Sequence, residues 1–176
     1  MPCSSKKLYC STTSNECVTF YKKSDQDATL AENQDRISKT VWLTRLSADL
    51  ITSGNGILFN AASETVGTID NTISPKDTLW AFGSWKNIRC HLDDVDFVVF
   101  RNLKEYIAEG LDDLAGKTVV LYLQNEKKYY QVKFLTWGQG GDGLASFGYK
   151  RSKCPLKVPK KFKKFVPTET VPYHDY

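Results

Sequence analysis

Short segments in which apolar and polar side chains alternate constrain the fold of this 176-residue chain more than any other feature. The segments at residues 18–21 and 41–46 alternate with a period of two, the period of a strand that buries one face. Similar short segments lie at residues 57–60, 88–92, 117–123, 128–136 and 144–150. Turn signals separate them at intervals of roughly ten residues, the spacing typical of β-sandwiches. We therefore predict a mainly all-β fold, a jelly-roll-like β-sandwich.

Helix is predicted in one place at most. Between residues 103 and 114, apolar side chains recur near helical spacing, although Gly110 weakens this pattern. Residues 24–38 are rich in Asp, Asn, Gln and Glu and are too polar for a strand, so we expect an ordered loop there. A short helical turn near residues 29–33 fits the same loop.

The chain divides into a body and two extensions. Residues 17–152 form the predicted sandwich, residues 1–16 a Ser/Thr/Lys-rich arm with cysteines, and residues 153–176 a Pro-containing tail. No apolar run approaches the roughly 18 residues that a membrane-spanning helix needs. The first residues also lack the apolar stretch of a secretory signal peptide, so we expect a protein that is either not secreted or already processed.

The net charge of +4 lies entirely in the tail, which has six lysines and two acidic residues. Prolines favour an extended tail over an amphipathic helix, which argues against membrane binding. We expect the tail to pack on neighbouring proteins, with apolar side chains in grooves and lysines against acidic rims; nucleic acid is the less favoured partner. The predicted partner-binding residues of the tail are Lys157, Lys160, Lys161, Phe162, Lys163, Lys164 and Phe165.

The five cysteines allow two interpretations. They are either reduced, or they form a disulfide that ties the N-terminal arm to the body or to a neighbouring subunit. An odd number leaves at least one thiol free or paired between chains. The spacing of Cys3, Cys10 and Cys17 does not match a zinc site, and we predict no metal.

The sequence contains no recognisable catalytic motif, and we expect no catalytic residue and no cofactor. Cys90 and His91 are neighbours in a predicted strand, so their side chains point to opposite faces and form a poor nucleophile pair. The glycine-rich residues 138–143 connect two predicted strands, which favours a turn over a phosphate-binding loop. The alternative to a metal-free protein is a calcium ion bound by acidic side chains between residues 25 and 35.

The tryptophans divide into two groups. Trp42 and Trp80 are predicted core residues, because buried tryptophans contribute large areas to the cores of small sandwiches. Trp85 and Trp137 adjoin glycine-containing loops, which leaves them open to either a core or a binding role. We include both among the candidate partner-binding residues.

The body, from about residue 19 to residue 151, resembles a module found in secreted proteins of environmental bacteria and in some large DNA viruses. The resemblance is carried by the order of several short motifs: Asp27-Ala28-Thr29-Leu30, Glu32 to Ile37, Val41 to Arg45, Phe59-Asn60-Ala61, Ser74-Pro75, Leu79 to Gly83, and Tyr130 to Phe134 leading through Trp137 to Phe147, Tyr149 and Arg151. It implies a non-enzymatic surface or adhesion role and carries over no active site.

Two hypotheses follow from the resemblance and the extensions. The leading one is a minor capsid or cement protein of a large icosahedral DNA virus, assembled in the host cytoplasm, because the chain lacks an export signal. Its arms would bind neighbouring capsid proteins in the virion. The alternative is an extracellular carbohydrate-binding or adhesion module, with Trp85 and Trp137 as stacking platforms.

Overall fold

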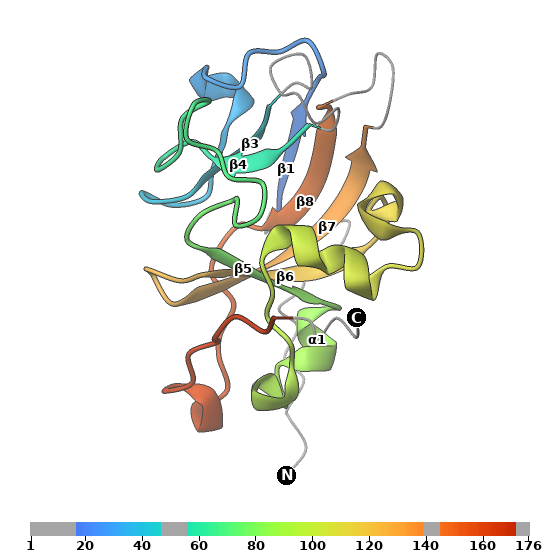
Figure 1. The fold of residues 1–176 in the computed structure, drawn as a ribbon. Coiled ribbons are helices and arrows are strands. Elements are labelled where there is room, and N and C mark those ends of the chain that lie inside the picture. The colour runs from blue at the N-terminus through green and yellow to red at the C-terminus, as the bar shows by residue number, and fades with distance from the viewer. Residues whose placement is uncertain (1–16, 47–55, 139–144, 172–176) are drawn as a thin grey trace.

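The computed structural model describes residues 17–46, 56–138 and 145–171, and their strands form two antiparallel sheets (Figure 1). The larger sheet contains, in spatial order, β1 (Cys17–Lys22), β8 (Phe147–Ser152), β7 (Lys128–Trp137), β6 (Thr118–Leu123) and β5 (Thr78–Phe82). The smaller sheet contains β2 (Asp35–Arg36), β3 (Trp42–Arg45) and β4 (Leu58–Asn60). The predicted mainly β, two-sheet architecture is therefore confirmed.

Strand alternation buries both faces of the larger sheet at β5, β6 and β7. In β6, Val119 and Leu121 point into one hydrophobic cluster, whereas Val120 and Tyr122 point into another. The first cluster, which we call the first core, lies between the two sheets and includes Leu43 of the smaller sheet. The second core lies on the opposite face of β5, β6 and β7. A sheet covered on both faces needs covering segments from outside the two sheets.

Short helical segments supply these covers. The 3-10 helices η4 (Phe100–Tyr106) and η5 (Gly110–Asp113) lie near the first core, and Phe100 contacts the buried Trp80 with ring centroids 5.1 Å apart. The helix α1 (Trp85–Ile88) and the 3-10 helix η3 (Leu92–Asp94) cover the second core (Figure 1). None of the described helices has the length and hydrophobicity needed to cross a membrane.

Of three local predictions of secondary structure, the structure supports two in part and shows that one is wrong. The predicted helix at 103–114 consists of η4 and η5, which are separate, with Gly110 at a φ of 69°. The predicted loop at 24–38 contains the expected helical turn as η1 (Ala31–Asn33) and also the two-residue strand β2. The predicted strand at 88–92 is wrong, because the chain there leaves α1 and turns into η3. Ile88 and Leu92 both reach the second core from these helical turns.

Trp80 is fully buried in the first core, as predicted, but Trp42 is only half-buried. The Trp42 indole N–H donates to the carbonyl of Ser38 at 3.1 Å, and the Arg36 guanidinium lies 4.2 Å from its ring centroid. Trp42 therefore lies at the margin of the smaller sheet, where the Arg36 guanidinium covers its ring. The prediction that Trp42 is a core residue is wrong.

A buried ion pair joins the two sheets. Arg151 of β8 donates from Nε to Asp35 Oδ2 at 2.6 Å and from Nη2 to Asp35 Oδ1 at 2.9 Å. The Tyr149 hydroxyl donates to Asp35 Oδ2 at 2.7 Å. Burial and then the Asp35 carboxylate raise the pKa of Tyr149 well above its usual value, so the phenol keeps its proton and remains a donor.

The cysteine question is resolved for three positions. Cys17 at the start of β1 and Cys90 after α1 are disulfide-bonded, whereas Cys154 is free and exposed. The interpretation that all cysteines are reduced is therefore wrong. Native disulfides typically contribute about 2–4 kcal/mol, mainly by restricting the unfolded chain. The predicted N-terminal arm, residues 1–16, lies outside the described residues.

Replacing Arg151 by methionine is expected to lower the free energy of unfolding by about 3–5 kcal/mol, because it leaves the Asp35 carboxylate buried without its cation. The matched control is Lys117→Met, which breaks the exposed pair between Lys117 and Asp113 (2.8 Å). That change is expected to cost less than about 1 kcal/mol. Urea unfolding under non-reducing conditions measures both. Equal, small losses would show that the Asp35–Arg151 pair does not hold the sheets together.

Candidate functional site

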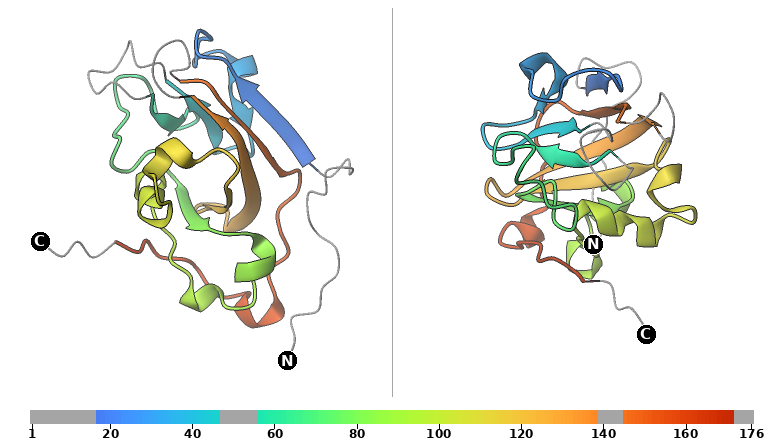
Figure 2. Two further views of the ribbon diagram at one scale, coloured as in Figure 1. Left: turned by 90° about the vertical axis from the view of Figure 1, so that its right-hand side faces the viewer. Right: turned by 45° about the horizontal axis from the view of Figure 1, so that its top comes forward.

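The C-terminal segment, which we define as residues 153–171, packs on the body of its own chain. Leu156 and Phe162 are each 6% exposed and belong to the second core. The Leu156 N–H donates to the Tyr129 carbonyl at 2.8 Å, and the Thr170 N–H donates to the Phe97 carbonyl at 2.7 Å. Figures 1 and 2 show the segment, with the 3-10 helix η7 (Lys160–Phe162), at the lower end of the molecule. Residues 153–171 therefore pack on their own chain through Leu156 and Phe162, and the expectation that the tail binds neighbouring proteins stays a prediction.

Five lysines of this segment point away from the body. We call them the lysine surface, and each of their side chains is exposed: Lys157, Lys160, Lys161, Lys163 and Lys164. The Lys161 ammonium lies 4.3 Å from the Phe162 ring centroid. The buried side chains of Leu156 and Phe162 thus fix the backbone of the segment on the body, while the lysine side chains stay accessible to a partner.

The two phenylalanines predicted to bind a partner have a different role. Phe162 is buried, and half-buried Phe165 lies against it with ring centroids 6.0 Å apart. Both therefore anchor the segment to the second core. Phe162 is removed from the candidate binding residues, because a partner cannot reach it without displacing the segment.

Trp85 is also a core residue, so of the two roles that the sequence left open for it the structure shows the core role. Its side chain is 1% exposed, and its ring lies against Tyr129 with centroids 5.2 Å apart. The Trp85 backbone N–H is held at the start of α1 by the Gln131 side-chain oxygen at 2.9 Å. α1 turns Trp85 into the second core, so a local helical turn decides its burial.

Trp137 remains a candidate, because it lines a cavity of about 300 Å³ that we call the Trp137 pocket. The pocket brings together the start of β4, the loop before β5, the helices η4 and η5, and the end of β7. Its apolar wall includes Leu58, Phe100, Leu111 and Trp137, and its polar residues include Asn71 and Arg101. A mainly apolar cavity with a few polar groups is the usual composition of a small-ligand site.

Arg45 holds Trp137 from one side. Its guanidinium carbon lies 3.8 Å from the centroid of the indole, and its N–H groups donate to the carbonyls of Gly56 (2.9 Å), Gly138 (3.0 Å) and Ser146 (2.8 Å). Burial lowers the pKa of Arg45 to about 10, against an opposing effect of Asp112, so Arg45 is still protonated at neutral pH. A buried cation therefore lies behind Trp137.

The loop that carries Asn71 is organised by the buried Glu64. Its carboxylate accepts hydrogen bonds from the Asn60 N–H (2.7 Å), the Lys76 N–H (3.0 Å) and the Ser74 hydroxyl. Ser74 precedes Pro75 across a cis peptide bond and also lines the pocket. Three donors from one loop and one strand thus converge on one carboxylate, which places Asn71 at the pocket.

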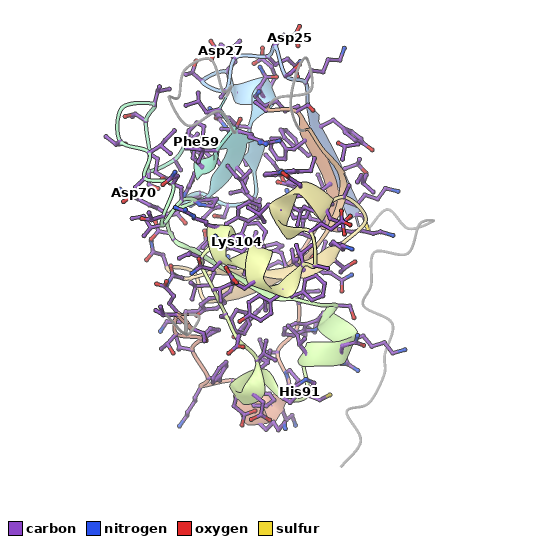
Figure 3. All side chains as sticks on the ribbon, turned by 45° about the vertical axis from the view of Figure 1, so that its right-hand side comes forward. Asp25, Asp27, Phe59, Asp70, His91 and Lys104 are labelled. Carbon is purple, nitrogen blue, oxygen red and sulfur yellow. The ribbon has the colours of Figure 1, made fainter. Side chains whose placement is uncertain are left out.

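The acidic loop and the histidine do not combine into a site. Asp27 accepts hydrogen bonds from the Thr29 N–H and hydroxyl, both at 2.8 Å, and Asp35 is occupied by Arg151. Figure 3 shows Asp25 and Asp27 at the opposite end of the molecule from His91. Across residues 17–46, 56–138 and 145–171, no group of three potential metal ligands occurs. Cys90 is disulfide-bonded, so its sulfur is not a thiolate nucleophile.

The lysine surface and the Trp137 pocket are separate. β7, which ends at Trp137, finishes at the upper end of the molecule, whereas η7 lies at the lower end (Figure 1). Asn71, Arg101 and Arg45 were not predicted as site residues. Each is an ordinary polar residue in its local sequence, and only the approach of distant segments brings Asn71 and Arg101 to the pocket and Arg45 to the Trp137 ring. The glycine-rich residues 139–144 lie outside the described residues.

Comparisons with known proteins identify no relative of this chain. No family model matches it, and neither the curated proteins nor the solved structures contain a significant match. The two-sheet fold agrees with the β-sandwich that the resemblance implies. The bacterial or viral relationship stays a prediction.

Replacing Phe162 by alanine is expected to lower the free energy of unfolding by about 3 kcal/mol, since it leaves a cavity in the second core. Trypsin should also cleave faster after Lys157, Lys160 and Lys161, because the segment loses its anchor. The matched control is Val166→Ala at a side chain that is 45% exposed, which should change neither quantity. Unaltered stability and proteolysis of the Phe162 variant would contradict the proposed anchoring.

Proposed function

We propose that this chain is a non-enzymatic structural protein that attaches to acidic neighbours through its lysine surface. The proposed setting is the particle of a large icosahedral DNA virus, in which the protein acts as a minor capsid or cement protein. The observation that carries the proposal is the arrangement of the C-terminal segment, whose Leu156 and Phe162 are buried while its lysines are exposed.

A fixed lysine surface favours specific attachment. An unstructured tail loses conformational entropy when binding orders its backbone, which weakens the association. A segment already packed on the body has lost that entropy on folding. Residues 153–176 carry the whole net charge of +4, and all six of their lysines lie in the segment, so long-range attraction directs this end of the molecule toward an acidic surface. Both effects suit a protein that must dock in one orientation between larger neighbours.

The disulfide bonds of Cys17 and Cys90 support a location outside the reducing cytosol once the protein is mature. Disulfides persist in oxidising surroundings, among them virion and cell surfaces. In this proposal the chain is assembled into particles in the host cytoplasm, and its disulfides stabilise the finished particle. The same bonds agree with an extracellular protein.

Neutralising the lysine surface is expected to reduce incorporation into particles. Four rim contacts of about 0.5 kcal/mol each correspond to an association about 30-fold weaker. The test compares the number of copies per purified particle for the native chain and for a variant with glutamine at four positions: Lys160, Lys161, Lys163 and Lys164.

The control has the same loss of charge at four exposed lysines of the body, and its incorporation should be normal: Lys39, Lys86, Lys104 and Lys133. Equal incorporation of the two variants would refute the lysine surface as the attachment site. Substitution is a better test than deletion of the segment, because deletion also removes Leu156 and Phe162 from the second core.

A second candidate function is a secreted carbohydrate-binding or adhesion module, and the Trp137 pocket favours it. Trp137 adjoins an apolar cavity that also has polar groups, the combination that binds one apolar face and several hydroxyls of a sugar. Trp85 takes no part in this function, since it is buried in the second core.

A further inference from the structure

We propose that the Trp137 pocket binds a single sugar ring that carries a carboxylate, such as a hexuronic acid residue of an acidic glycan. The inference rests on the second candidate function, glycan binding, and specifies the class of sugar. It is independent of the lysine surface at the other end of the molecule.

The size of the pocket favours one ring. Its volume of about 300 Å³ lies at the lower limit of the range for small-ligand sites, so an extended oligosaccharide does not fit inside. One ring can enter while the rest of a glycan chain continues into solvent. The loop before β5 and the helices η4 and η5 supply most of the lining outside the two sheets.

Trp137 supplies a rigid apolar surface for that ring. Phe134 and Phe147 contact it at interplanar angles of 88° and 70°, with centroids 5.8 Å and 6.3 Å away, while Arg45 covers one face. Phe100, which also lines the pocket, lies against the indole with centroids 5.5 Å apart, so a ligand meets the part of the Trp137 ring that Arg45 and these phenylalanines leave uncovered. The face of an aromatic ring is electron-rich and attracts the slightly positive C–H groups of a sugar.

The charges around the pocket select an anion. Arg101 lines the pocket and is exposed, and no ion pair between described residues includes Arg101 or Arg45. The hydrogen bonds of Arg45 go to three backbone carbonyls, which leave its positive charge without a carboxylate in contact. Asp112 is the acidic group whose charge acts on Arg45 from a distance. Arg101 in the wall of the pocket and Arg45 behind Trp137 both make the electrostatic potential in the pocket more positive.

Two side chains give the pocket its polar contacts. The Arg101 guanidinium offers paired N–H donors that match the two oxygens of a carboxylate. The Asn71 amide both donates and accepts, which suits a sugar hydroxyl that does the same. Asn71 is held near the pocket by the loop that Glu64 organises.

The experiment is an NMR titration of the full-length chain with methyl β-glucuronoside and methyl β-glucoside, observed at the tryptophan indole N–H signals. The expected result is a saturable shift of the Trp137 signal that is stronger with the glucuronoside. The signals of buried Trp80 and Trp85 serve as internal controls and should not move. Added salt should weaken binding of the glucuronoside and leave the glucoside unaffected.

Arg101→Gln is expected to weaken glucuronoside binding by about tenfold, the effect of losing a charge-assisted hydrogen bond, with no effect on the glucoside. The matched control is Lys104→Gln, which removes an exposed cation from the same helix, η4, outside the pocket. Figure 3 shows the position of Lys104. Lys104→Gln should leave both affinities unchanged.

Other outcomes would overturn the inference in distinguishable ways. Equal binding of the two sugars, insensitive to Arg101→Gln, would refute selection for an acidic sugar and leave glycan binding in place. No saturable shift with either sugar would refute both. Preferential binding of adenosine monophosphate, included as a third probe, would replace the acidic sugar by a nucleotide.

Discussion

The buried ion pair between Asp35 and Arg151 is the interaction on which the rest of the structure depends. β2 contains only two residues, and its carboxylate is satisfied only when β2 lies over β8, where Arg151 and Tyr149 donate to it. Both charges are removed from water, and a packing of the sheets that separated them would leave each charge buried at a large desolvation cost. The pair therefore fixes the smaller sheet on the larger one. The Trp137 pocket, which is bounded by the start of β4 and the end of β7, depends on that placement.

The second constraint is the burial of both faces of β5, β6 and β7. Alternate residues of β6 point into different cores, so the face opposite the smaller sheet also requires a cover. α1, η3 and the C-terminal segment provide it, and the lysines of that segment become a fixed feature of the surface. A segment with the composition of a flexible basic tail is thereby part of the folded body. This coupling of a buried apolar side to an exposed cationic side is what links the fold to the proposed attachment.

The comparison of sequence with structure depends on how local each signal is. The strands at β1, β3, β6 and β7 were predicted because a period of two is a property of neighbouring residues on one strand. The strand predicted at 88–92 failed because alternation over five residues is a weak signal: Ile88 ends α1, Leu92 begins η3, and both reach the second core from these separate turns. Trp85 was left open to a core or a binding role, Phe162 was expected at a binding surface, and both are buried. Nothing in their immediate sequences indicates that a second core exists to receive them.

By itself, the sequence determined the all-β architecture, the positions of most strands and the concentration of positive charge between residues 153 and 164. These follow from alternation, turn residues and charge, which are encoded in short stretches of chain. Only the tertiary structure decided that Trp137 borders a cavity while Trp85 is buried in the second core. It also decided that Asn71 and Arg101 line that cavity and that Arg45 lies against the Trp137 ring. It also decided that the basic segment lies on its own body. Burial depends on which distant segments cover a residue, and packing between distant segments produces no periodic pattern of apolar residues in the sequence.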